Sequence, residues 1–110
     1  MLGKYVISPS GTSQFHWALK AANGETILSS QLYASKQGAE NGIDSCRTNS
    51  RTDECFSRLQ SKDGQPYFVL KAANGEAIGT SQMYSSDSAR ENGIASCKEN
   101  GKSETKDESK

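Results

Sequence analysis

The stretch KAANGE stands at residues 20–25 and is repeated letter for letter at residues 71–76. Shifting the chain by 51 residues aligns 19–50 with 70–101 without a gap, and 19 of the 32 aligned positions are identical. A match of this extent indicates an internal duplication. Because two copies are too few for a solenoid, we expect them to pack as a pseudo-symmetric pair that shares one core.

The sequence around KAANGE predicts a β-hairpin in each copy. FHWALKA and PYFVLKA are rich in aromatic and branched residues, and ETILSS and EAIGTS follow as return strands. Shorter strands are expected upstream, at residues 4–8 and 56–60, separated from the hairpins by loops rich in Gly, Ser and Asp. Each copy therefore begins with three strands.

Two turn types would place different side chains on the core face. A two-residue type I′ turn at Asn23 and Gly24 would pair Leu19 with Leu28 and Lys20 with Ile27, and so mix lysine with isoleucine on one face. A type I turn centred on Ala22 and Asn23, with Gly24 as a left-handed bulge, moves the register by one residue. A one-residue slip moves the whole apolar set to the other face, so we predict the bulged turn.

The bulged register predicts a core face and an open face. It pairs Leu19 with Ile27 and Leu70 with Ile78 on one face, and Lys20 with Thr26 and Lys71 with Ala77 on the other. The core face then collects Phe15, Trp17, Leu19, Ile27, Phe68, Leu70 and Ile78. The open face carries His16, Ala18, Lys20, Leu28, Tyr67, Val69 and Lys71, and we expect it to face water or a partner.

A helix is predicted after each hairpin. Ala39, Gly42, Ile43 and Cys46, with Gly93, Ile94 and Cys97 in the second copy, have the spacing of one helix face. Ser35 and Ser86 are the expected N-caps, Asp87 adds a favourable charge, and Asn49 and Asn100-Gly101 are the expected left-handed stops.

Gly42 belongs to an Asn-Gly pair that would otherwise suggest a turn, but a turn there would leave two helical stubs too short to be stable. We therefore expect a helix whose glycine lies close to the sheet. Two helices covering one face of an antiparallel sheet give the α+β class.

Composition excludes several functional classes. The chain has 110 residues, 33% of them hydrophobic, and its 13 basic and 13 acidic side chains cancel. A neutral chain has no global field for nucleic acid or an anionic membrane. No apolar run approaches the ~20 residues of a membrane span or suits a signal peptide. We expect a soluble, cytoplasmic protein.

The three cysteines, Cys46, Cys55 and Cys97, form no CxxC pair. This count and spacing predict neither a disulfide framework nor a zinc site. We expect Cys46 and Cys97 to act as small buried hydrophobes and Cys55 to be a free thiol.

The doubled motifs LKAANGE, SQ.Y.S and ENGI.SC resemble the YegP-like bacterial proteins of unknown function, in their duplicated form. The resemblance covers residues 5–101 approximately. It implies β-β-β-α-β units joined in one sheet, with their last strands exchanged between repeats. Single-repeat relatives would reach this arrangement by dimerising, so the resemblance implies that this chain is a monomer that serves as its own dimer.

The resemblance also implies boundaries. Repeats are expected at about 4–53 and 54–101 in one domain, and residues 54–60 would close the first unit and open the second. Residues 102–110 are strongly polar, so we expect a short final strand at most in a largely disordered tail. The resemblance brings no enzymatic activity and no catalytic residue.

The sequence predicts no catalytic site, cofactor or metal. His16 is the only histidine, and no phosphate-binding glycine loop opens a helix. A binding module is the preferred class, through an open-face surface of His16, Lys20, Tyr67 and Lys71 that would suit a protein partner. A weak single-stranded nucleic-acid site on the same face remains as an alternative, although two lysines make no groove.

A third hypothesis is an enzyme with two equivalent sites built from Lys20, Glu25 and Asn41 and from Lys71, Glu76 and Asn92. The structural interpretation is preferred to it: Asn41 and Asn92 would hydrogen-bond nearby backbone, and the lysines would be solvated.

Overall fold

Each repeat folds into three antiparallel strands followed by a helix, in a computed structural model that describes residues 3–11 and 13–107. The first repeat contains β1 (Lys4–Ser10), β2 (Gln14–Lys20), β3 (Thr26–Ser30) and α1 (Lys36–Asn49). The second contains a short 3-10 helix, η1 (Asp53–Cys55), then β4 (Phe56–Gln60), β5 (Pro66–Lys71), β6 (Ala77–Thr80) and α2 (Asp87–Asn100). A final strand, β7 (Thr105–Asp107), follows α2.

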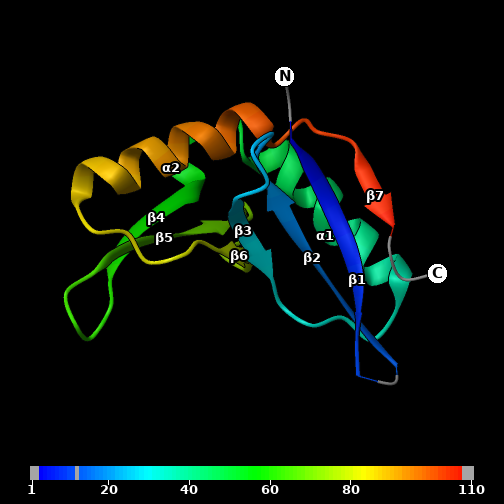
Figure 1. The fold of residues 1–110 in the computed structure, drawn as a ribbon. Coiled ribbons are helices and arrows are strands. Elements are labelled where there is room, and N and C mark those ends of the chain that lie inside the picture. Colours follow the sequence, from blue (N-terminus) through cyan, green and yellow to red (C-terminus); the bar gives the residue numbers. More distant parts are fainter. Residues whose placement is uncertain (1–2, 12, 108–110) are drawn as a thin grey trace.

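The strands form one sheet in the order β4-β5-β6-β3-β2-β1-β7 (Figure 1). Neighbouring strands are antiparallel except β1 and β7, which are parallel. The helices cross between repeats, since α1 packs on β2, β5 and β6, and α2 packs on β2, β3 and β5. The predicted α+β class with a mainly antiparallel sheet is confirmed.

Both KAANGE turns have the predicted bulged geometry. Gly24 and Gly75 have φ of 88° and 90°, and no described residue other than glycine has positive φ, so Asn23 is not left-handed. The amide of Gly24 donates to the carbonyl of Ala21 at 2.9 Å, which closes a type I turn centred on residues 22 and 23. The side chain of Asn23 accepts from the amide of Glu25 at 3.0 Å and stiffens the loop.

The predicted register holds for one residue beyond the turn and then fails. Lys20 pairs with Thr26 and Lys71 with Ala77, as expected, but a second bulge follows in each hairpin. Leu19 therefore pairs with Leu28, and Leu70 with Gly79, in place of Ile27 and Ile78. The extra residue lets both Ile27 and Leu28 enter the core, where their exposed fractions are 5% and 0%. Placing Leu28 on the open face was wrong.

Leu28 has a partner that the sequence did not suggest. Its counterpart in the second repeat is Gly79, across the junction of β3 and β6. A Cβ at Gly79 would lie 2.8 Å from Cγ of Leu28, closer than real contacts allow. The side chain of Leu28 thus fills the space that Gly79, which has no side chain, leaves at the junction of the repeats.

The helices begin as predicted and end differently. The hydroxyls of Ser35 and Ser86 accept from the amides of Gly38 and Ala89, each at 3.0 Å. The predicted left-handed stops are wrong, because the C-caps Ser50 and Gly101 have φ of −68° and −59°.

The asparagines near the helix ends act through their side chains. Nδ2 of Asn49 donates to the carbonyl of Ser45, and Nδ2 of Asn100 to that of Ser96. Asn100 also accepts from the amide of Gly3 at 2.8 Å. Gly101 is required by a close approach, because a Cβ there would overlap Oγ of Ser50, its counterpart in the first repeat.

The core lies between the sheet and both helices. The predicted core residues are buried, except that Phe15 is only partly buried, and Tyr5, Ile7 and Phe56 join them. Cys46 and Cys97 are buried free thiols, as predicted, and Cys55 is a partly buried one. Tyr5 donates to the carbonyl of Gly101 at 2.6 Å and lies 3.2 Å from Sγ of Cys46, which ties β1 to both helices.

The C-terminal strand crosses back to the first repeat. β7 pairs with β1, with Val6 opposite Lys106, which confirms an exchanged final strand. Arg47 holds this segment by donating to the carbonyl of Ser103 at 2.9 Å and to the hydroxyl of Thr105 at 2.8 Å. β7 is the short final strand that the sequence allowed for, and the expected disorder of the rest of the tail stays a prediction; residues 108–110 lie outside the described part.

β4 follows α1 and pairs with β5, so it opens the second repeat; in the described chain it pairs with no strand of the first repeat, and its expected closing role there stays a prediction. It begins only at Phe56, because Glu54 and Cys55 belong to η1. Within the described chain, no helix combines the length and apolar character needed to cross a membrane.

Candidate functional site

The predicted open-face surface does not converge. His16 and Lys20 lie on β2, whereas Tyr67 and Lys71 lie on β5. β3 and β6 run between these strands, so the two pairs are about 14 Å apart at the usual strand spacing. The four side chains are partly buried. They do not frame one ligand-sized site.

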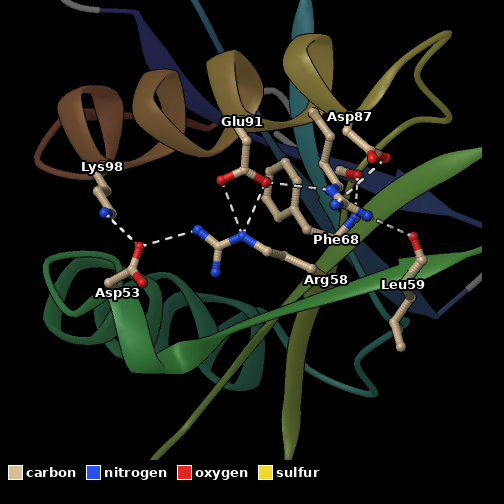
Figure 2. Close-up of polar contacts among 9 residues, drawn as sticks. Asp53, Arg58, Leu59, Phe68, Asp87, Glu91 and Lys98 are labelled. Atoms are coloured by element: carbon tan, nitrogen blue, oxygen red, sulfur yellow. Dashed lines mark hydrogen bonds and ion pairs between the residues drawn. The ribbon is translucent and has the colours of Figure 1, made fainter.

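A network of ion pairs joins α2 to β4 and η1 (Figure 2). Arg58 donates through Nε to both carboxylate oxygens of Glu91, at 2.9 and 3.0 Å, and through Nη2 to Asp53 at 3.2 Å. Lys98 reaches Asp53 at 2.8 Å. Hydrogen bonds from Lys98 and Arg58 lower the pKa of Asp53, and those from Arg58 lower the pKa of Glu91. These groups bind one another, so the network is structural.

A pocket of about 270 Å³ lies between the first KAANGE turn and α2 of the other repeat. The hairpin of the first repeat contributes Ala21, Asn23, Glu25, Thr26 and Ile27. The second repeat contributes Gln82, Tyr84, Ala89, Asn92, Gly93 and Ser96.

A matching pocket of about 200 Å³ lies between the second KAANGE turn and α1. All ten of its lining residues are counterparts, 51 positions away, of residues that line the first pocket. They are Gln31, Tyr33, Gly38, Asn41, Gly42, Ser45, Ala72, Glu76, Ala77 and Ile78.

The pockets correct the hypothesis of two equivalent sites. The expected sets combined Glu25 with Asn41 and Glu76 with Asn92. The structure instead brings Glu25 to Asn92 and Glu76 to Asn41, because α2 packs on β3 of the first repeat as well as on β5, and α1 on β6 of the second repeat as well as on β2. Lys20 lines neither pocket.

The preferred structural role of Asn41 and Asn92 is also wrong. Both side chains are exposed, and Asn41 accepts a hydrogen bond from the side chain of Gln37 at 3.0 Å rather than binding backbone. The side chain of Asn92 makes no hydrogen bond to any other residue that the structure describes.

A tyrosine forms one wall of each pocket. Tyr84 stacks on Phe68 with ring centroids 6.2 Å apart, and a Cβ at Gly93 would overlap its hydroxyl. Tyr33 and Gly42 repeat the close approach of the tyrosine hydroxyl to the helix glycine. The prediction that a helix glycine lies at a close approach is therefore confirmed. The physical role of the glycine is that its missing side chain leaves room for a tyrosine. Burial raises the pKa of Tyr84, and the nearby charge of Glu25 acts in the same direction.

A basic cleft lies where the two helices end, lined by Arg47, Ser50, Arg51, Lys98 and Lys102. Arg47 and Lys98 already bind Ser103 and Asp53. Cations are also favoured beside the carbonyl ends of helices. Two of the four cations that line this cleft therefore have structural partners. Among the residues described, no group of three or more His, Cys, Asp or Glu side chains is arranged to hold a metal ion.

A family model described as a domain of unknown function, DUF1508, matches residues 12–56 and again residues 61–108. The chain belongs to the DUF1508 family. Each match contains the hairpin and the helix of one repeat, so the chain carries the DUF1508 domain twice, and the resemblance drawn from the doubled motifs is confirmed.

Relatives in this family extend over nearly the whole chain. A UPF0339 protein of Shewanella oneidensis is 54% identical over 105 residues, which are 96% of each chain. The UPF0339 protein YegP of Escherichia coli is 51% identical over the same share of each chain.

Two solved DUF1508 structures have the same fold. The solution structure of YegP from Escherichia coli matches with a TM-score of 0.93 at 49% identity, covering 99% of this chain and 95% of that one. The solution structure of the Shewanella oneidensis protein matches with a TM-score of 0.91 at 54% identity, covering 97% and 92%. These comparisons supply a fold and a family without an activity.

Sequence reasoning missed several pocket residues. Gln31, Tyr33 and Ser45, with their counterparts in the second repeat, are identical in both copies, and this identity was the available signal. This identity could not be interpreted as a pocket without knowing which hairpin turn each helix lies beside.

Proposed function

We propose that the chain is a non-enzymatic binding module that holds a small polar ligand in each of two matching pockets. The observation that carries this proposal is that KAANGE of one repeat and the ENGI helix of the other enclose a pocket, twice. Most side chains that line the pockets are identical in the two repeats.

The polar side chains of the first pocket support a ligand role over a scaffold role. Asn100 on α2 is a structural asparagine, 6% exposed and bonded to Ser96 and Gly3. Asn92 lies two turns earlier on the same helix, exposed and without such bonds. A side chain that stabilises no other part of the protein is available to bind a ligand.

The pockets suit binding better than catalysis. General acid–base chemistry needs a positioned proton acceptor or donor beside the reacting group. In the part of the chain that the structure describes, each pocket is lined by one carboxylate and by no histidine or cysteine. Their volumes lie below the roughly 300–1,000 Å³ of drug-sized sites, so the ligand is small.

Amide-resolved NMR titration with a panel of small amines, alcohols, amides and carboxylates tests the proposal. We expect shifts at the amides of Asn92, Gly93 and Ser96, and at their counterparts in α1. If every responding amide lies on the open face of the sheet, the pocket proposal is wrong.

Two alanine variants on the same helix separate a ligand role from a structural role. Asn92→Ala should leave thermal stability within about 0.5 kcal/mol and weaken binding at the first pocket. Asn100→Ala should destabilise the fold by about 1–3 kcal/mol, because it leaves the amide of Gly3 unsatisfied. Equal destabilisation by the two variants would mean that Asn92 is part of the scaffold.

A further inference from the structure

Each pocket contains one charged side chain, and it is a carboxylate. Glu25 lines the first pocket and Glu76 the second, at the same position after the turn glycine. No lysine, arginine or histidine among the described residues lines either pocket. Both pockets therefore present a local negative charge on a chain whose formal net charge is zero.

These two carboxylates differ from others that lie near cations. Asp44, Asp53, Asp87 and Glu91 all form ion pairs with arginine or lysine. Within residues 3–11 and 13–107, Glu25 and Glu76 form none. Their charge is available to an incoming cation.

The remaining walls suit an alkylammonium group. An ammonium ion has three donors and no acceptor. The first pocket offers acceptors on Glu25, Gln82 and Asn92, and its tyrosine ring adds a π-face. Ile27 and Ala89 supply an apolar surface for a short carbon chain.

We propose, on the premise of the binding function above, that the ligand is a small aliphatic primary amine, bound as its ammonium ion. Glu25 is the counter-ion in the first pocket and Glu76 in the second. The carbon chain lies against the isoleucine and alanine surface, and the neutral amides orient the head group.

The two sites are predicted to differ in affinity. Asn41 in the second pocket already accepts a hydrogen bond from Gln37, whose counterpart in the other repeat is Ser88. Asn92 in the first pocket is free of such a bond and that pocket is larger, about 270 against 200 Å³. The first pocket should therefore bind the amine more tightly.

NMR titration of the intact protein at pH 7 tests whether binding needs a positively charged head group. The three compounds titrated, butylamine, 1-butanol and butyrate, share a carbon chain and differ in head group. Butylamine should shift the amides of Asn92 and Gly93 at the lowest concentration, with the α1 counterparts following at higher concentration. Glu25→Gln should weaken butylamine binding at the first pocket about fivefold, the larger end of what an exposed ion pair contributes.

Two control variants complete the design. Glu40→Gln removes an exposed carboxylate from α1 that lines neither pocket, and should leave both sites unchanged. Glu76→Gln should weaken only the second site. An unchanged pattern of amide dispersion shows that each variant is folded.

The outcomes separate the two proposals. If butanol binds in the pockets as tightly as butylamine, the cation claim is overturned and the binding function stands. Equal weakening by Glu40→Gln and Glu25→Gln would also overturn it, since nonspecific charge would then explain the response. If none of the three compounds shifts a pocket amide, the amine is not the ligand, and the wider panel decides whether the pockets bind anything.

Discussion

Leu28 and Gly79 should behave as one unit in a double-mutant cycle. Leu28→Ala removes buried carbons from a side chain with no exposed surface, which costs about 2–5 kcal/mol. Gly79→Ala adds a Cβ at 2.8 Å from Cγ and 2.9 Å from Cδ2 of Leu28. Overpacking should lower the free energy of unfolding by about 1–3 kcal/mol, whereas the better strand propensity of alanine should raise it by about 0.5–1 kcal/mol. The net loss for Gly79→Ala is therefore about 1–2 kcal/mol.

The double variant removes the main clash. Once Leu28 is alanine, Cγ and Cδ2 are gone, and the closest remaining neighbour of the new Cβ is the carbonyl of Ser29 at 3.0 Å. Alanine at position 79 then partly fills the space that Leu28 leaves. We expect the double variant to be about 1–2 kcal/mol more stable than the sum of the single effects predicts.

Urea unfolding monitored by circular dichroism measures each free energy of unfolding, provided that the slope with urea is unchanged. Tyr5→Phe combined with Gly79→Ala is the control, because β1 lies three strands from β6 and the two effects should add. Additivity of Leu28→Ala and Gly79→Ala within about 0.5 kcal/mol would refute the account of the repeat junction.

Three other substitutions test separate contacts. Tyr5→Phe should destabilise the fold by about 1–3 kcal/mol in thermal unfolding, because it leaves the buried carbonyl of Gly101 without its donor at 2.6 Å; no loss would mean that another group satisfies it. Ser86→Ala should cost about 1 kcal/mol by removing the N-cap of α2, and unchanged urea unfolding would contradict that capping role. Arg58→Met should lower stability at pH 7 but much less in acid. The pKa of Glu91 is lowered in the fold, so the stability it contributes is present above its ordinary value of 4.5 and is lost as pH falls through the folded value. The free energy of unfolding is measured from pH 7 to pH 2 for the unsubstituted protein and for Arg58→Met. A constant difference between the two over this range would contradict this reasoning.

The sequence predicted features that depend on neighbouring residues. The geometry of the KAANGE turn follows from a glycine that adopts positive φ and an asparagine that binds the amide two residues on. The helix starts follow from Ser35 and Ser86, whose hydroxyls cap amides within the first turn. These interactions are local, so one repeat contains all the information they need.

The second bulge and the tail depended on distant residues. Ile27 and Leu28 both enter the core only because Gly79 leaves space across the repeat junction. The polar segment after α2 is ordered because β1 offers an unpaired edge and Arg47 binds the carbonyl of Ser103. Neither partner is near in the sequence, and local apolar patterning therefore gave the wrong register and could not place the final strand.

For KAANGE as a candidate site, too, neighbouring residues determined some features and distant residues determined others. By itself the sequence determined that the hexapeptide closes a hairpin in each repeat, with Glu25 and Glu76 just past the turn. Only the tertiary structure decided that each helix packs on strands of both repeats, so that α2 reaches the first turn and α1 the second, which brings Glu25 to Asn92 and Glu76 to Asn41. The physical reason is that helix placement minimises exposed core across the whole sheet, and no spacing within one repeat records that choice.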